Sequence, residues 1–466
     1  MSWIAFAILL LLASCEEELS TDPVDRVVPT TVEEYHAVMV GGLPGVYHAF
    51  TDLMTDDVVA KNYTSFNNPS VYSEWSKAYL WIDQRASDEA TSPEYAWRWY
   101  YADIYKLNLV IANVMDADGD KDFAASIKGE ALLTRAYSYF MLVNMFARNY
   151  DTATAETDLG VPLSLEPLDA GFHYFKRNTV AEVYAQIEKD MLEGLELIND
   201  QYIEKPKFHF TKVSALAFAS RFYLYTGDYE KTVEYSNAAW AINSNLLDHN
   251  EFPNSDEGEV FEPMVHANNY FTDERDNVLF IRPGYFAVNY YKSGFYANDF
   301  LRIYEYRDLR GKQNFTFTNT SAPNYITLKL SLSYEQYNFP LFRTEEVLLN
   351  RAEAYAKLGD DDNKVNAIRD LNTLRKMRFT PEYYVAYKFN DFKTKQAMID
   401  AVLLERRKEL CYEGHRWFDL KRNGYPELEH YFNGVKYILE QNDLRYVLQI
   451  PDNELVNNPE IEKNPR

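Results

Sequence analysis

Five side chains that could exchange protons gather within one short block near the C-terminus. Glu405, Glu409 and Glu413 follow one another at four-residue intervals, a spacing that places them on one face of a helix. Paired carboxylates are what a glycoside hydrolase needs to cleave a glycosidic bond. His415 and Asp419 come shortly after and would complete an acid–base group.

The same block also contains the cations that such carboxylates need as partners. Arg406, Arg407, Lys408 and Arg416 are interleaved with the acids. Because arginine binds a carboxylate through two parallel hydrogen bonds, an ion-pair network that fixes a helix end explains the same residues. We therefore predict a structural role for the block and no catalytic residues, and hydrolysis is the less favoured alternative.

The motifs of metal sites and cofactor sites are missing from the sequence. The eight histidines include no pair at the close spacing of a zinc motif. The run Asp116–Asp122 begins like a calcium loop, but Lys121 stands where that loop needs glycine and Ile127 where it needs glutamate. We interpret the run as a solvated turn. Nucleotide-binding and nucleophile motifs are absent too, so no metal and no cofactor is predicted.

Aromatic and amide side chains in two predicted loops offer a different chemistry, which is binding without reaction. A tyrosine or tryptophan ring presents an apolar face to the C–H face of a sugar, while amides and carboxylates bond its hydroxyl groups. The candidate ligand-binding residues are Asp57, Asn62, Trp75, Tyr79 and Trp81 in the first loop and Tyr290, Tyr291 and Tyr296 in the second. For any single ring, core packing or loop anchoring is the competing interpretation. Trp97 and Trp99 follow a helical pattern and are predicted to lie in the core.

The composition indicates a globular protein and argues against nucleic-acid binding. Of the 466 residues, 47% are hydrophobic and 25% are charged, which is typical of a folded chain. Lysine and arginine number 47 against 71 aspartates and glutamates, so the formal net charge is −24 and a polyanion would be repelled. The two cysteines, Cys15 and Cys411, do not suggest a disulfide framework, and Cys411 is predicted to be a buried small residue.

Helical periodicity accounts for most of the chain after Thr31. The predicted helices are Glu94–Met115, Gly129–Ala147, Val180–Ile198, Lys212–Tyr225, Thr232–Ile242, Thr344–Leu358 and Lys364–Met377. Gly227-Asp228 and Gly359-Asp360 separate the last four into two hairpins, since glycine can end a helix and aspartate can begin the next.

A short repeat supports this scaffold. An arginine followed four residues later by a tyrosine recurs at Arg135, Arg221 and Arg351, and the hairpins are similar to tetratricopeptide units with unequal spacing. The sequence therefore predicts an all-α, tetratricopeptide-like helical hairpin scaffold. Long irregular insertions are expected near 56–92, 148–178 and 245–341.

The first fifteen residues predict a lipoprotein signal. Trp3 to Ala13 is an apolar run that would rise about 16 Å as a helix, roughly half a bilayer core, so it fits a secretory segment and not a membrane span. Leu12-Ala13-Ser14-Cys15 resembles a lipobox, which predicts a signal peptide over 1–14 and lipidation of Cys15. The lysine or arginine that usually precedes such a segment is missing. Residues 15–30 are expected to form an extended tether.

Several longer motifs resemble those of the SusD/RagB family. The block Glu405–Arg422 is similar to the family signature ER-x-x-EL-x-x-EG-x-R-W-x-DL-x-R, and the ending from Ile450 to Pro465 is similar to the family's C-terminal pattern. Arg343–Ala354 and Gly129–Phe146 resemble two further family blocks. Together with the lipobox, the resemblance covers nearly the whole chain and implies a single SusD-like domain over 31–466.

The resemblance also implies a function and a location. Family members are lipid-anchored at the extracellular face of the cell outer membrane, and they bind nutrients without catalysis or cofactor. The nutrient is most often an oligosaccharide or polysaccharide, which is delivered to a TonB-dependent transporter of the SusC-like type. The membrane would be contacted through the lipid anchor only. The same scaffold binding peptides or another nutrient is the alternative. Family ligand sites use the loop before the second long helix and the central insertion.

Overall fold

The computed structural model describes residues 29–60, 74–83, 92–169, 171–252, 271–284, 295–297, 302–317, 325–327, 329 and 338–466. Over these residues the fold is mainly helical, as predicted. The longer helices are α2 (Val32–Gly41), α4 (Pro93–Asn113), α5 (Lys121–Phe146), α6 (Val180–Leu197), α7 (Lys212–Thr226), α8 (Tyr229–Ile242), α10 (Thr344–Leu358), α11 (Asp361–Lys376) and α12 (Lys395–Leu410). The short ones are α3 (Glu74–Tyr79), α9 (Leu309–Gln313), α13 (Arg416–Arg422) and α14 (Asp452–Asn457).

Each predicted helix is present, and most ends lie within one turn of the predicted ones. The start of α5 is an exception, because it begins at Lys121 and not at Gly129. Its first turn is fixed by the Asp120 side chain, which accepts hydrogen bonds from the Asp122 and Phe123 amides. The acidic run 116–122 therefore contains a helix cap, which agrees with its interpretation as a turn.

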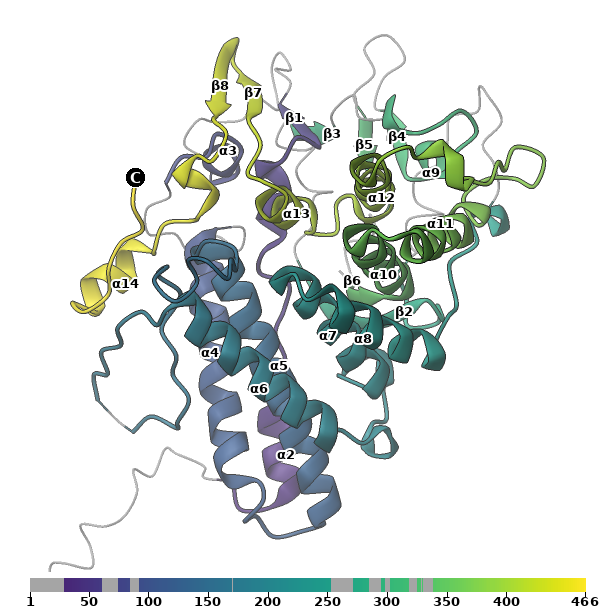
Figure 1. The fold of residues 1–466 in the computed structure, drawn as a ribbon. Helices are drawn as coiled ribbons and strands as arrows, with labels where there is room; N and C mark the ends of the chain where they lie inside the picture. Colours follow the sequence, from purple (N-terminus) through teal and green to yellow (C-terminus); the bar gives the residue numbers. More distant parts are fainter. Residues whose placement is uncertain are drawn as a thin grey trace, which may run out of the picture.

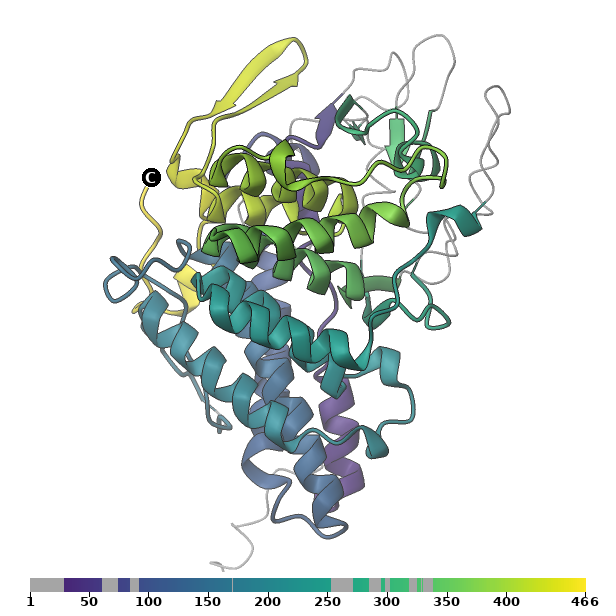
Figure 2. The same ribbon diagram turned by 45° about the vertical axis from the view of Figure 1, so that its right-hand side comes forward.

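The helices pack as successive antiparallel pairs. α5 lies against α6, α7 against α8 and α10 against α11, while α10 also contacts α8 and α12. Figures 1 and 2 show α2, α4, α5 and α6 toward one end of the molecule, whereas the β1-β3-β5-β4 sheet, the β7–β8 hairpin, α12 and α13 lie toward the other and β2 and β6 lie between, beneath α10. This arrangement confirms the predicted hairpin scaffold.

Both predicted hairpin turns are built as the sequence suggested. Gly227 and Gly359 end α7 and α10 in the left-handed conformation, with φ values of 79° and 82°. Asp228 and Asp360 then accept hydrogen bonds from the Lys231 and Asn363 amides at the starts of α8 and α11. The helix reversals are thus set by local sequence alone.

The repeated arginines hold neighbouring helices together through buried ion pairs. Arg135 of α5 binds Asp190 of α6 with N–O distances of 2.7 and 2.8 Å. Arg351 of α10 binds Asp370 of α11 in the same way. Arg221 of α7 instead binds Glu346 of α10, so this arginine connects two hairpins and not the two helices of its own hairpin. The repeated arginines therefore all form buried ion pairs between helices, but the helices that they join differ from one repeat to the next.

Within the described residues, short strands from the insertions and from the C-terminal part of the chain form three small sheets. β2 (Val278–Pro283) pairs with β6 (Asn338–Arg343) at the base of α10, and β7 (Leu428–Phe432) pairs with β8 (Val435–Leu439) as a hairpin. The third sheet has the order β1-β3-β5-β4 and contains β1 (Val58–Ala60), β3 (Phe295–Ala297), β5 (Tyr325–Thr327) and β4 (Phe315–Phe317). These strands are short, so the scaffold remains all-α, but they decide which insertions lie side by side.

Burial tests several predictions about single residues. Trp97 and Cys411 are buried, as predicted. The prediction that Trp99 lies in the core is wrong, because 36% of its surface is exposed to solvent. Its ring lies beside those of Tyr47 and Tyr95. Trp97 and Tyr100 of the same helix are buried, so the helical pattern alone did not separate Trp99 from its buried neighbours.

Candidate ligand-binding face

The structure brings the two predicted aromatic loops together. β1 follows Asp57 in the first loop, and β3 lies at the end of the second loop. The two strands are more than two hundred residues apart along the chain. The two strands pair antiparallel, with Val58 opposite Ala297, Val59 opposite Tyr296 and Ala60 opposite Phe295. We call the surface formed by β1, α3, the β1-β3-β5-β4 sheet and the β7–β8 hairpin the loop face (Figure 1).

Ion pairs from the C-terminal block anchor the first loop beneath this face. Arg416 binds both carboxylate oxygens of Asp56 at 2.9 Å, and Arg407 donates from Nε to Asp57 at 2.8 Å. The Tyr412 hydroxyl donates to the Asp57 carbonyl. Burial alone would raise the pKa of Asp56, but the hydrogen bonds and charges of Arg416 and Arg407 lower it below its ordinary value. The loop therefore starts from a rigid base.

Asp57 consequently does not present its carboxylate to a ligand. It is 2% exposed, and its side chain lies against Arg407 inside the protein. Burial raises the pKa of Asp57 despite the charge of Arg407. The prediction that Asp57 contacts ligand is corrected to a structural role, because its arginine partner lies in the distant C-terminal block and could not be paired with it from sequence.

Tyr79 and Trp81 are also interior residues and not ligand platforms. They are 1% and 3% exposed, and both stack on the His430 ring, with centroid distances of 4.0 and 4.2 Å. Trp81 Nε1 donates to the Met54 carbonyl at 2.9 Å. Because His430 lies between them in the β7 strand, these rings fasten α3 to the hairpin. For both, the competing interpretation of loop anchoring is the correct one.

The remaining predicted residues stay predictions. Trp75 lies in α3, is partly buried and packs against the main core at one edge of the loop face. The backbone of Tyr296 lies in β3. Asn62, Tyr290 and Tyr291 lie outside the described residues. The pairing of Ala60 with Phe295 nevertheless places the described residue that precedes Asn62 in the chain beside the one that follows Tyr290 and Tyr291.

The β7–β8 hairpin adds exposed side chains that the sequence analysis missed. Tyr431 is 55% exposed and Val435 53%, while the alternate residues of β7 point into the core. The Tyr79 hydroxyl donates to the Tyr431 carbonyl at 3.3 Å, which ties the hairpin to α3. The dipeptide Asn433-Gly434, with positive φ at both residues, is a hairpin signal that could have revealed it.

A second exposed aromatic group lies where the chain enters α9. Tyr306 is 77% exposed, and the Arg307 guanidinium lies 4.8 Å from its ring centroid and 5.1 Å from that of Tyr383. Arg307 has a φ of 70°, a left-handed conformation that costs energy for a residue with a side chain. Sequence reasoning missed this group because it joins two segments far apart in the chain.

Comparison with known proteins identifies the family. A family model described as "Starch-binding associating with outer membrane" matches residues 24–224, and the SusD family model matches residues 221–466, more than half of the chain. The chain belongs to the SusD family. A curated SusD-like protein of Formosa agariphila is 23% identical over 99% of this chain and 98% of its own length.

Solved structures of SusD proteins show the same fold. A putative sugar-binding protein of Bacteroides vulgatus is 23% identical, with a TM-score of 0.75 over 94% of this chain and 99% of that one. A SusD superfamily protein of Bacteroides thetaiotaomicron is also 23% identical, with a TM-score of 0.72 over 94% and 100%. A laminarin-binding SusD-like protein is 20% identical, with a TM-score of 0.62 over 93% and 98%. The recognised family and the all-α fold class are thereby confirmed.

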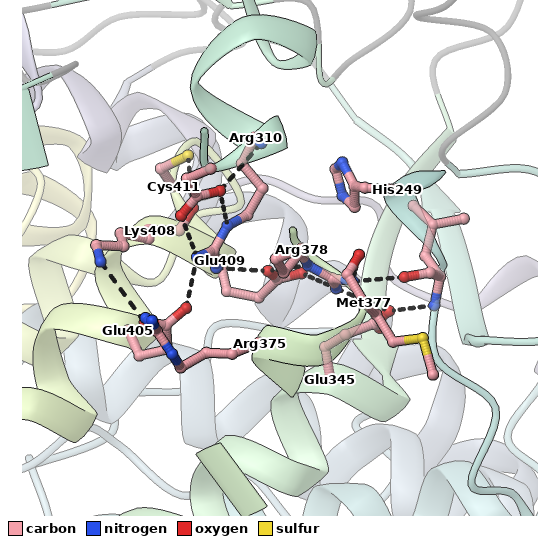
Figure 3. A network of polar contacts seen from close by, with 12 residues as sticks. His249, Arg310, Glu345, Arg375, Met377, Arg378, Glu405, Lys408, Glu409 and Cys411 are labelled. Atoms are coloured by element: carbon pink, nitrogen blue, oxygen red, sulfur yellow. Dashed lines mark hydrogen bonds and ion pairs between the residues drawn. The ribbon is translucent and has the colours of Figure 1, made fainter. Parts of the chain in front are cut away.

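The acidic block of this SusD-family chain is a buried ion-pair network (Figure 3). Glu409 is 3% exposed and accepts hydrogen bonds from Arg310 at 3.0 Å, Arg343 at 2.9 Å and Arg378 at 2.7 Å. Glu405 also pairs with Arg310. Burial alone would raise the pKa of Glu409, but the charges of Arg378 and Arg343 lower it well below its ordinary value. Glu409 is therefore an ionised carboxylate held by three arginines, which is the structural role that the sequence predicted for the block.

The cavity beside the end of the acidic block is small in the part of the chain that the structure describes. The cavity that touches Glu413 and His415 has a volume of 10 Å³, enough for one water molecule. Burial, with the charge of Arg221, lowers the pKa of His415 well below its ordinary value, so its ring is neutral. Within the described residues, no group of three or more acidic, histidine or cysteine side chains could hold a metal ion.

None of the helices that the structure describes combines the length and apolar character needed to span a bilayer.

Proposed function

We propose that this protein is an extracellular nutrient receptor that binds an oligosaccharide or polysaccharide at the loop face and delivers it to a TonB-dependent, SusC-like transporter. The pairing of β1 with β3 carries the proposal, because it joins two aromatic loops that lie far apart in sequence. Rings collected from separate segments on a rigid helical base are what a sugar-binding surface needs.

The comparisons support a glycan as the ligand. The family model that covers the first half of the chain is described as starch-binding, and one solved relative is described as laminarin-binding. The ligand contacts that we propose are Trp75, Tyr296 and Tyr431 together with Asn62, Tyr290 and Tyr291. By analogy with base stacking, one stacked ring contributes roughly 1–2 kcal/mol, so a few rings would give micromolar to millimolar affinity. Weak binding of this order allows the ligand to be released to a transporter.

The location follows from the lipobox. We propose that Cys15 carries the lipid, that 15–30 forms the tether and that the folded part lies outside the outer membrane. If so, Cys15→Ser should abolish labelling by a fatty-acid probe and move the protein from the membrane fraction to the soluble fraction. A Cys15→Ser protein that remains lipid-labelled would contradict the anchor. Co-purification of a SusC-like β-barrel with the lipidated protein would test the transporter partner.

Affinity electrophoresis tests the ligand class. The soluble chain beginning after Cys15 is run through gels that contain starch, laminarin or other polysaccharides. We expect retardation by at least one glycan and its loss in a Trp75→Ala/Tyr290→Ala/Tyr291→Ala variant. Trp99→Ala, which removes a partly exposed tryptophan of α4 away from the loop face, is the matched control. If every glycan leaves the mobility unchanged, the proposal fails for glycans and the alternative of a peptide ligand is favoured.

A further inference from the structure

A separate cavity lies between three segments on the side of the molecule. Its walls are α4, the segment 162–175 and the C-terminal helix α14, which lie side by side in Figure 1. Its volume is 510 Å³, within the range of small-molecule binding sites. None of the residues predicted to bind ligand from sequence lines this cavity.

One wall is a row of aromatic rings on α4. Trp97, Tyr101 and Tyr105 follow at intervals of four residues, so they share one face of the helix about 6 Å apart. That spacing is close to the length of one pyranose unit in a glycan chain. Trp97 forms the buried end of the row, and Tyr105, which is 46% exposed, forms the open end. Phe175 faces them from the opposite wall.

Polar groups surround these rings. Arg98 and His173 offer hydrogen-bond donors, and Ser164, Asn453 and Asn457 offer both donors and acceptors. Acidic and basic side chains are mixed around the cavity, since Glu94 and Glu454 also line it. This combination favours a neutral ligand that has many hydroxyl groups and an apolar face.

The cavity is held open by hydrogen bonds between its walls. Trp97 Nε1 donates to Glu454 of α14 at 3.2 Å, and the Tyr101 hydroxyl donates to the Pro162 carbonyl at 2.8 Å. Asn458 at the end of α14 donates to the Phe175 carbonyl at 2.9 Å. Because all three walls are tied to one another, little ordering would be needed when a ligand binds.

The walls of the cavity argue against a peptide bound as an added strand. Peptides are commonly bound by adding a strand to an open sheet edge, and none of the residues that line this cavity lies in a strand. We propose that this cavity is a second glycan-binding site, which holds a short segment of a neutral oligosaccharide or polysaccharide against Tyr101 and Tyr105, with the buried Trp97 at its inner end. The ligand class rests on the proposed function, whereas the position of the site does not.

A second site would change how long chains bind. A smaller cavity, lined by Trp81, Ile82 and Lys77, shares Glu94 and Pro451 with this one, so the two cavities adjoin on the side that leads toward α3. One polysaccharide that contacts both the loop face and the α4 cavity would gain affinity through effective concentration. Disaccharides would not show this gain, because they occupy one site at a time.

Fluorine NMR of the soluble chain labelled with 5-fluorotryptophan separates the two sites. Maltose, laminaribiose, cellobiose and xylobiose are titrated into the millimolar range, and the Trp97 and Trp75 signals are assigned with the Trp97→Phe and Trp75→Phe variants. We expect at least one disaccharide to shift the Trp97 signal in a saturable manner. Tyr105→Ala should weaken this response about tenfold, the value of one stacked ring.

Tyr174→Ala is the matched control, because Tyr174 is 49% exposed on the neighbouring segment but does not line the cavity. It should leave the Trp97 response unchanged. If no disaccharide shifts Trp97, or if Tyr105→Ala leaves the response intact, the second site is refuted. A response at Trp97 without one at Trp75 would support this site while counting against the loop face. The reverse result would support the loop face only.

Discussion

Replacing Glu409 with glutamine should reveal how much the buried ion-pair network stabilises the fold. Glu409 is 3% exposed and bonded to Arg310, Arg343 and Arg378. Glutamine has nearly the same shape as glutamate but carries no negative charge. The three buried guanidinium groups would therefore lose one of the carboxylates that balance their charge. Breaking a buried ion pair from one side typically costs about 3–5 kcal/mol, since the remaining charge stays desolvated.

That cost converts into a measurable shift of the unfolding midpoint. For a chain of 466 residues the entropy of unfolding is about 1 kcal/mol/K, so Glu409→Gln should lower the midpoint by about 3–5 °C. Thermal unfolding followed by circular dichroism at pH 7 measures it. Glu193→Gln is the control, because Glu193 lies 2.8 Å from Lys128 but is 38% exposed. An exposed pair contributes less than about 1 kcal/mol, so its midpoint should fall by less than about 1 °C.

The same network predicts the direction of the pH dependence. The folded-state pKa of Glu409 is lowered well below its ordinary value, so its contribution is present above the unfolded pKa and is lost as the pH falls toward the folded pKa. The wild-type protein should therefore lose stability below about pH 4.5, and Glu409→Gln should lose less over that range. Equal midpoints for wild type and Glu409→Gln at pH 7, or an equal fall in Glu193→Gln, would refute the reasoning.

Three further changes test other parts of the structure. Gly194→Ala should lower the free energy of unfolding in urea by about 1–3 kcal/mol, because the new Cβ would lie 2.7 Å from the Gly129 carbonyl oxygen. Gly41→Ala is the control and should leave that free energy unchanged, because its Cβ would meet nothing within 4 Å. Asp57→Asn should speed hydrogen exchange of the β1 amides, since it weakens the bond to Arg407, and unchanged exchange would count against the anchoring role. Trp81→Ala should lower stability by about 3–5 kcal/mol as a loss of core packing, and a fully stable variant would show that Trp81 is not an anchor.

The sequence determined the features that depend on neighbours along the chain. The helices and the caps at Gly227 and Gly359 follow from periodicity and turn chemistry, which act within a few residues. The structural role of the acidic block was predicted correctly, but the partners were not. Glu409 is bound by Arg310, Arg343 and Arg378 from distant segments. The interleaved Arg407 and Arg416 bind Asp57 and Asp56 of the first loop instead.

Only the tertiary structure decided which aromatic rings are available to a ligand. Trp81 and Tyr79 have the composition of a binding loop, but His430, far along the chain, fills the space between them. Conversely, Trp97 is buried as its helical pattern predicted, yet α14 and the segment 162–175 leave a cavity beside it and Tyr101. A side chain's exposure depends on what packs against it from distant segments, and no local pattern contains that information.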